Sequence, residues 1–194
     1  MSGDKYTNAI TGVNELLKSI VNDKDTKNTA MIVEFEGSTI KTTLELGTKI
    51  PETYKGKGTG GMTPLNQAIG ETLEHVEKRR KNNYSEDDKV LVNIFTDGEE
   101  NSSRGKFADK KLLDEYVQEL KTKGFTITLI GTEEVVAYAI NTLSLDASNT
   151  LVHNNTAADI TRSFMDTVSA RVMYSKSVSK GEDVTKRFYT KTLS

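Results

Sequence analysis

The spacing of hydrophobic residues along the chain predicts helices alternating with strands. In residues 4–21 the apolar positions recur with helical periodicity and predict an opening helix; they are Ile10, Val13, Leu16, Leu17, Ile20 and Val21. Residues 29–46 contain two extended arms around the turn Glu36-Gly37-Ser38, which is a hairpin signal. Because both arms carry many polar residues, we expect this hairpin at the edge of a sheet.

The remainder of the chain repeats a strand and helix pattern. A second helix is expected from Pro64 to about Asn82, with Pro64 at its first position and Thr63 as its cap. The almost unbroken apolar run from Val90 to Phe95 predicts a central parallel strand buried on both faces, and its one polar residue, Asn93, needs a partner. The further predicted elements are a helix at 107–122 ended by Gly124, a strand at 125–132, a helix at 135–143, a strand at 150–153 and a helix at 157–179.

This order of elements predicts an α/β fold. We expect a Rossmann-like, open and mostly parallel sheet flanked by helices, with one antiparallel edge strand. The sequence has only two prolines, and neither a repeat nor a linker divides it. We therefore expect a single domain at 1–181, followed by an irregular or weakly extended C-terminal tail at 182–194.

Composition excludes several classes of function. The 26 Lys and Arg residues nearly balance the 28 Asp and Glu residues, and no basic stripe is present, so nucleic acid is not an expected partner. The chain has no cysteine, which excludes disulfides and thiolate metal sites. The opening residues lack the features of a secretory signal, and no run of eighteen apolar residues occurs. We expect a soluble, cytoplasmic protein with no membrane partner.

The candidate chemistry lies where strands are predicted to end. Ligands of open α/β sheets bind at the carboxyl ends of the strands. Two loops qualify, one carrying Thr63 and the other carrying Asp97 followed by Gly98. Taken alone, Thr63 is explained as a helix cap and Asp97 as part of an ordinary Asp-Gly turn. Together they present a hydroxyl and a carboxylate, which are hard oxygen ligands suited to Mg²⁺ or Mn²⁺.

Other conspicuous residues do not predict a site. The glycine-rich loop at 56–61 matches neither phosphate-binding pattern, so nucleotide binding has little support. His153 has no second ligand at zinc spacing, and His75 is expected at the surface or at the boundary between helix and sheet. The basic run at 77–83 is interpreted as a solvated helix end. No serine has an evident His and Asp partner, so we predict no catalytic and no cofactor-binding residues.

Two stretches resemble a known family. "GGMTPLNQAIG" at 60–70 and "VLVNIFTDGEEN" at 90–101 look like the second and third metal motifs of von Willebrand factor A domains, and the stretch at 125–155 resembles the stand-alone versions in bacteria and phages. The resemblance implies a metal-ion-dependent adhesion site to which Thr63 and Asp97 contribute. It also implies a non-catalytic, protein-binding role, in which an Asp or Glu of the partner completes the coordination of the ion.

The resemblance fails at the beginning of the chain. In the family, a first central strand ends in Asp-x-Ser-Gly-Ser, whereas this chain starts with residues that resemble those just after that motif. The resemblance therefore implies that the first central strand and three principal ligands are absent from these residues, and that Mg²⁺ or Mn²⁺ binding is weak or absent. We expect an in-frame upstream coding segment that supplies them. Alternatively, the neighbouring strands close up, or the tail at 184–193 or a strand from a partner chain fills the gap.

Two other functions remain open from the sequence. The chain could be a metal-independent interaction or structural protein whose loops keep only their shape. It could also be an Mg²⁺-dependent hydrolase that uses Asp97 with Glu99 or Glu100, although no nucleophile and base pair supports this. The sequence identifies neither the partner nor the oligomeric state.

Overall fold

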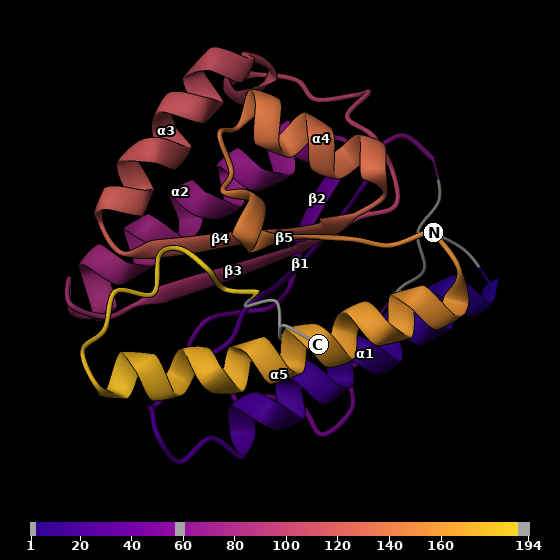
Figure 1. Ribbon diagram of the computed structural model, residues 1–194. Coiled ribbons are helices and arrows are strands. Elements are labelled where there is room, and N and C mark those ends of the chain that lie inside the picture. Colours follow the sequence, from indigo (N-terminus) through magenta and orange to yellow (C-terminus); the bar gives the residue numbers. More distant parts are fainter. Residues whose placement is uncertain (1–2, 57–60, 190–194) are drawn as a thin grey trace.

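The computed structural model describes residues 3–56 and 61–189, and it places helices on both sides of a central sheet (Figure 1). Three helices lie on one side, namely α2 (Leu65–Asn83), α3 (Lys110–Thr122) and α4 (Glu133–Thr142). Two helices lie on the other side, namely α1 (Gly3–Val21) and α5 (Ala157–Ser179). Short 3₁₀ turns cover Lys106–Ala108 and Ala147–Asn149. The predicted α/β class is confirmed.

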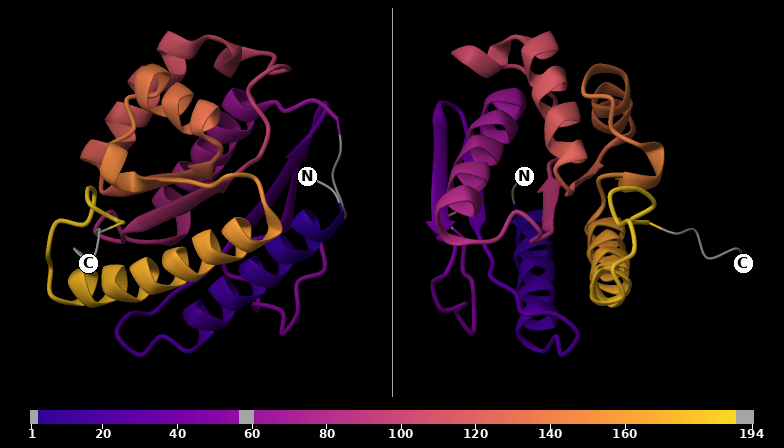
Figure 2. Two further views of the ribbon diagram at one scale, coloured as in Figure 1. Left: turned by 45° about the vertical axis from the view of Figure 1, so that its right-hand side comes forward. Right: turned by 90° about the vertical axis from the view of Figure 1, so that its left-hand side faces the viewer.

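The strands form two separate sheets among the described residues. A parallel sheet contains β3 (Val90–Phe95), β4 (Phe125–Gly131) and β5 (Thr150–Val152) in that order. The predicted hairpin is present as the antiparallel pair β1 (Ile32–Glu36) and β2 (Thr39–Leu44). The hairpin stands beside the parallel sheet without pairing to it (Figure 2). The sequence analysis predicted one sheet, whereas the described strands form two sheets with a gap between them.

The helix starts differ from the sequence prediction in detail. α2 begins at Leu65, one residue later than predicted, and Pro64 rather than Thr63 occupies the cap position without a side-chain hydrogen bond. α3 begins at Lys110 because the Asp109 carboxylate accepts hydrogen bonds from two main-chain N–H groups of its first turn. α4 begins at Glu133, two residues before the predicted start.

β3 is less buried than its apolar sequence predicts. Every residue of β4 is buried, whereas Ile94 is the one fully buried residue of β3. The prediction of a central strand buried on both faces is wrong for β3, which lies at the end of its sheet and has one edge facing a cavity instead of a neighbouring strand. The expected partner of Asn93 is present, since the Thr128 hydroxyl donates a hydrogen bond of 2.9 Å to the Asn93 side-chain oxygen.

A buried ion pair locks α1 to α5, which lie side by side (Figure 1). The Arg171 guanidinium lies 2.5 Å from the Asp23 carboxylate and donates a second hydrogen bond to the Ser19 carbonyl. Burial raises the pKa of Asp23, but hydrogen bonds from Thr26 and three further donors outweigh it and hold that pKa well below its usual value. Both charges are therefore satisfied within the layer below the sheet.

The C-terminal tail does not occupy the gap as far as it is described. The Val184 carbonyl accepts a hydrogen bond from the Thr126 hydroxyl of β4, and the Phe188 N–H donates to the Asn149 side chain. Both Val184 and Phe188 are buried in these positions. The expectation that residues 184–193 fill the gap is therefore wrong for 184–189, and residues 190–194 lie outside the described part. The neighbouring strands also do not close up, because β1 and β3 remain unpaired with each other.

In the described ranges 3–56 and 61–189, no helix has the length and apolar character needed to span a membrane.

Candidate functional site

Three loops meet at the carboxyl edge of the sheet. The turn that follows β1 donates the Gly37 N–H to the Met62 carbonyl over 2.6 Å. The same turn accepts a hydrogen bond of 3.3 Å at the Gly37 carbonyl from the Ser102 hydroxyl, in the loop after β3. The ends of β1 and β3 and the start of α2 are thereby held together.

The loops carrying Thr63 and Asp97 are joined directly. The Asn101 N–H donates to the Thr63 carbonyl over 3.1 Å, and the Thr63 N–H donates to the Asn101 side-chain oxygen over 2.7 Å. The Thr63 hydroxyl lies so close over Gly98 that a Cβ added there would be 2.3 Å from it. The structure therefore brings Thr63 next to the Asp97-Gly98 pair, as the order of the two motifs predicts.

The loop after β3 also caps α2, a role that the sequence analysis gave to Thr63. Glu100 accepts a hydrogen bond of 2.6 Å from the Asn66 N–H, and the Ser103 hydroxyl accepts one of 2.9 Å from the Gln67 N–H. Glu100 also accepts from the Ser103 hydroxyl and main chain. In the sequence, Glu100 and Ser103 are a carboxylate and a hydroxyl three residues apart, which is a pattern that can cap a helix. The N–H groups that they cap belong to Asn66 and Gln67, more than thirty residues earlier in the chain.

The oxygen atoms of Thr63 and Asp97 are of the type that a hard cation prefers, but they are too few to complete its coordination. Asp97 supplies a carboxylate and Thr63 a hydroxyl, which are ligands that Mg²⁺ and Mn²⁺ accept. Mg²⁺ takes about six oxygen ligands in near-octahedral geometry. Over the described residues, no three His, Asp or Glu side chains gather into a metal-binding group. These residues therefore do not fit an ion held firmly by the protein alone.

A buried histidine lies behind this edge, at the end of β5. The His153 side chain stacks at 6.0 Å on Phe95, and its Nδ1 atom accepts a hydrogen bond of 3.0 Å from the Asn155 N–H. Because Nδ1 is an acceptor, the hydrogen-bond pattern assigns the proton of the neutral ring to Nε2. Burial lowers the pKa of His153, and the negative charges of Asp97 and Asp159 oppose that shift without cancelling it.

A parallel sheet flanked by helices, with oxygen-bearing loops at its carboxyl edge, defines a Rossmann-like α/β protein. Residues 26–167 match the von Willebrand factor type A domain, and the chain therefore belongs to that family. The matched region begins after α1 and ends within α5.

Comparison with individual proteins supports the fold and says nothing further about function. No curated protein matches the chain. Among solved structures, it is similar to proximal thread matrix protein 1 from the mussel byssus, with 17% sequence identity and a TM-score of 0.62. The similarity covers 83% of this chain and 40% of the mussel protein, so the chain spans less than half of that protein's length.

We predict that Gly98→Ala destabilises the protein by about 1–3 kcal/mol, because the new methyl group overlaps the Thr63 hydroxyl. Adding Thr63→Ala should relieve the overlap, giving a coupling free energy of about 0.5–3 kcal/mol in a double-mutant cycle measured by chemical denaturation. Thr63→Ser keeps the hydroxyl and serves as the control that should give little relief. Additive free-energy changes in all combinations would show that the two loops do not touch.

A second prediction concerns pH. The unfolded chain binds a proton near pH 6.5, whereas buried His153 binds it only at lower pH, so its contribution to stability is present above pH 6.5 and is lost as the pH falls. The slope from one such group is at most about 1.4 kcal/mol per pH unit. Denaturation between pH 5 and 8 should show a weaker dependence for His153→Gln than for the unmodified protein. His75→Gln, at the other histidine, is the control. If His153→Gln leaves the pH dependence of stability unchanged, that dependence does not come from His153.

Proposed function

We propose that the chain is a non-catalytic protein-binding module whose contact surface is the sheet edge carrying Thr63 and Asp97. Membership of the von Willebrand factor A family implies a protein-interaction role. The observation that carries the proposal is the pair of reciprocal hydrogen bonds between Thr63 and Asn101, which fixes both candidate ligands at one edge.

In this proposal the two residues form part of a metal-ion-dependent adhesion site. Asp97 contributes the negative charge that attracts Mg²⁺ or Mn²⁺, and Thr63 contributes a neutral oxygen, directly or through water. A bound ion would supply positive charge and open coordination positions to an Asp or Glu of another protein. With two protein ligands, the chain by itself binds the ion weakly or not at all.

The two alternatives are less well supported. A metal-independent interaction protein would use the same loops for shape alone, and the hydrogen bonds that hold them are compatible with that role. An Mg²⁺-dependent hydrolase would need Glu99 or Glu100 beside Asp97. Glu100 is already committed to the α2 cap and to Ser103, which leaves it poorly placed to serve as a metal ligand.

The proposal predicts that calorimetric titration with Mg²⁺ or Mn²⁺ gives weak heats at best, and that these disappear in Asp97→Ala. It further predicts that a protein retained by the immobilised chain in millimolar Mg²⁺ is lost in EDTA and in Asp97→Ala. Asp166→Ala on the exposed face of α5 is the matched control and should retain that protein. Micromolar metal affinity that survives Asp97→Ala, or equal retention in EDTA and in Asp97→Ala, would contradict the metal-bridge mechanism.

A further inference from the structure

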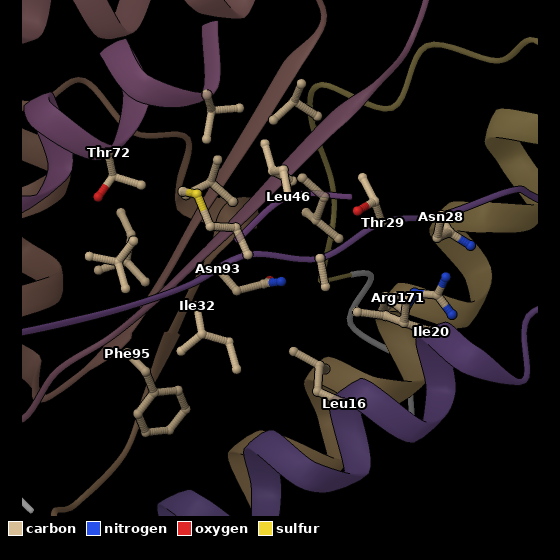
Figure 3. Close-up of a pocket in the computed structure, with 18 of the residues that line it drawn as sticks. Leu16, Ile20, Asn28, Thr29, Ile32, Leu46, Thr72, Asn93, Phe95 and Arg171 are labelled. Atoms are coloured by element: carbon tan, nitrogen blue, oxygen red, sulfur yellow. The ribbon is translucent and has the colours of Figure 1, made fainter. Parts of the chain in front are cut away.

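A large cavity separates β1 from β3. It has a volume of about 2540 Å³, and both strands contribute to its lining (Figure 3). Pockets for small molecules usually measure about 300–1,000 Å³. The space between the two pieces of sheet, which we name the slot, is therefore sized for a polypeptide segment.

The edge of β3 presents main-chain groups to the slot. The Val90 N–H donates to Gly124 and the Thr96 N–H donates to Ile130, so the even-numbered residues point toward β4. Main-chain groups alternate in direction along a strand. The N–H and C=O groups of the odd-numbered residues Leu91, Asn93 and Phe95 therefore point into the slot. In the described part of the chain, β3 has no strand partner on this side.

The edge of β1 is arranged in the same way. Glu36 pairs with Thr39 across the two-residue turn, and this closing pair carries the first hydrogen bonds of the hairpin. The main-chain groups of Val33 and Phe35 therefore point away from β2. β1 contributes to the lining of the slot, and β2 does not. Within residues 3–56 and 61–189, the two facing edges each present a row of main-chain donors and acceptors without a strand partner, and an extended backbone could satisfy both rows.

The two edges run in the same direction. The turn after β1 is hydrogen-bonded to the start of α2 and to Ser102 after β3, so both strands have their carboxyl ends at the same edge of the molecule. β1 contributes five residues and β3 contributes six. The geometry thus favours an occupant of five or six extended residues that runs parallel to both strands.

Helices on both sides of the slot contribute apolar side chains to its lining. Figure 3 shows Leu16 and Ile20 of α1 approaching it from one side. Ile69 and Val76 also line the slot, and they belong to α2, which lies on the other side of the sheet. Arg171 also reaches the slot, but its charge is neutralised by Asp23. An occupant buried in this way needs apolar side chains on both of its faces, as central parallel strands have.

The end of the slot at the start of β3 is acidic. The exposed loop there contains three consecutive acidic residues, Glu86, Asp87 and Asp88, against the single cation Lys89. Glu182 and Asp183, which follow α5, line the same cavity. The cations Arg80, Lys121 and Lys123 line it as well, but Arg80 is buried and Lys123 is paired with Glu77 and Glu119. The acidic side chains therefore outnumber the cations at this end. A parallel occupant enters the slot at this end, so basic residues before its apolar run would complement the charge.

We propose that the slot binds, from a separate polypeptide, one apolar strand of five or six residues that is preceded by Lys or Arg. The bound strand runs parallel to β1 and β3 and completes a continuous sheet between them, which is recognition by strand addition at two edges at once. The described tail is packed on β4 and does not compete for the position. Thr63 and Asp97 lie at one end of the same cavity, but the pairing of the strand with β1 and β3 does not depend on a metal.

The test is fluorescence anisotropy of the full chain with a labelled peptide containing two lysines, six alternating valines and leucines, and a polar tail. We expect saturable binding that weakens about tenfold or more when proline replaces the third strand residue, because proline removes a main-chain donor. Replacing the lysines by glutamates should also weaken binding. Added salt should reduce the difference in affinity between the lysine peptide and the glutamate peptide.

A matched pair of protein variants locates the site. Val33→Lys places a charge on the strand beside the slot, whereas Thr42→Lys changes its register partner on the outer strand β2. Val33→Lys should reduce affinity about tenfold or more and Thr42→Lys should leave it unchanged. The comparison of parent and proline peptides needs no variant protein, so it decides the question even if Val33→Lys does not fold. Absence of saturable binding, or equal binding of the two peptides, overturns the proposal.

Discussion

The structure depends on one constraint, which is that the main chain of a strand inside a protein needs hydrogen-bond partners on both edges. β4 meets this condition, since β3 and β5 flank it and all of its residues are buried. Among the residues that the structure describes, β1 and β3 each have a strand partner on one edge only. The apolar sequence of β3 suits the centre of a sheet, and its half-exposed position follows from the missing neighbour.

The slot and the candidate binding edge are adjacent parts of one arrangement. Thr63 and Asp97 line the carboxyl end of the same cavity that β1 and β3 border. A strand lying parallel to β1 and β3 would therefore end beside these two residues, where its next residues could add oxygen ligands. The unpaired strand edges and the candidate site would then both contact the bound strand.

Much of the fold follows from local sequence signals. The periodicity of α1 and the turn of the hairpin both predicted elements that the structure contains. The errors occur where partners come from distant parts of the chain. Arg80 lies in a run interpreted as solvated, yet it is buried over the Phe125 ring and donates to the Lys123 carbonyl. The α2 cap comes from Glu100, and the neighbours of a loop in space cannot be read from residue spacing.

The central claim is that β3 has an open edge, and amide hydrogen exchange tests it residue by residue. The N–H groups of Val92 and Ile94 point toward β4, whereas those of Leu91 and Phe95 point into the slot. The account predicts slow exchange at the first pair and much faster exchange at the second, measured by NMR on the chain alone. Equal protection of all four amides would mean that this edge is covered, and would contradict the account.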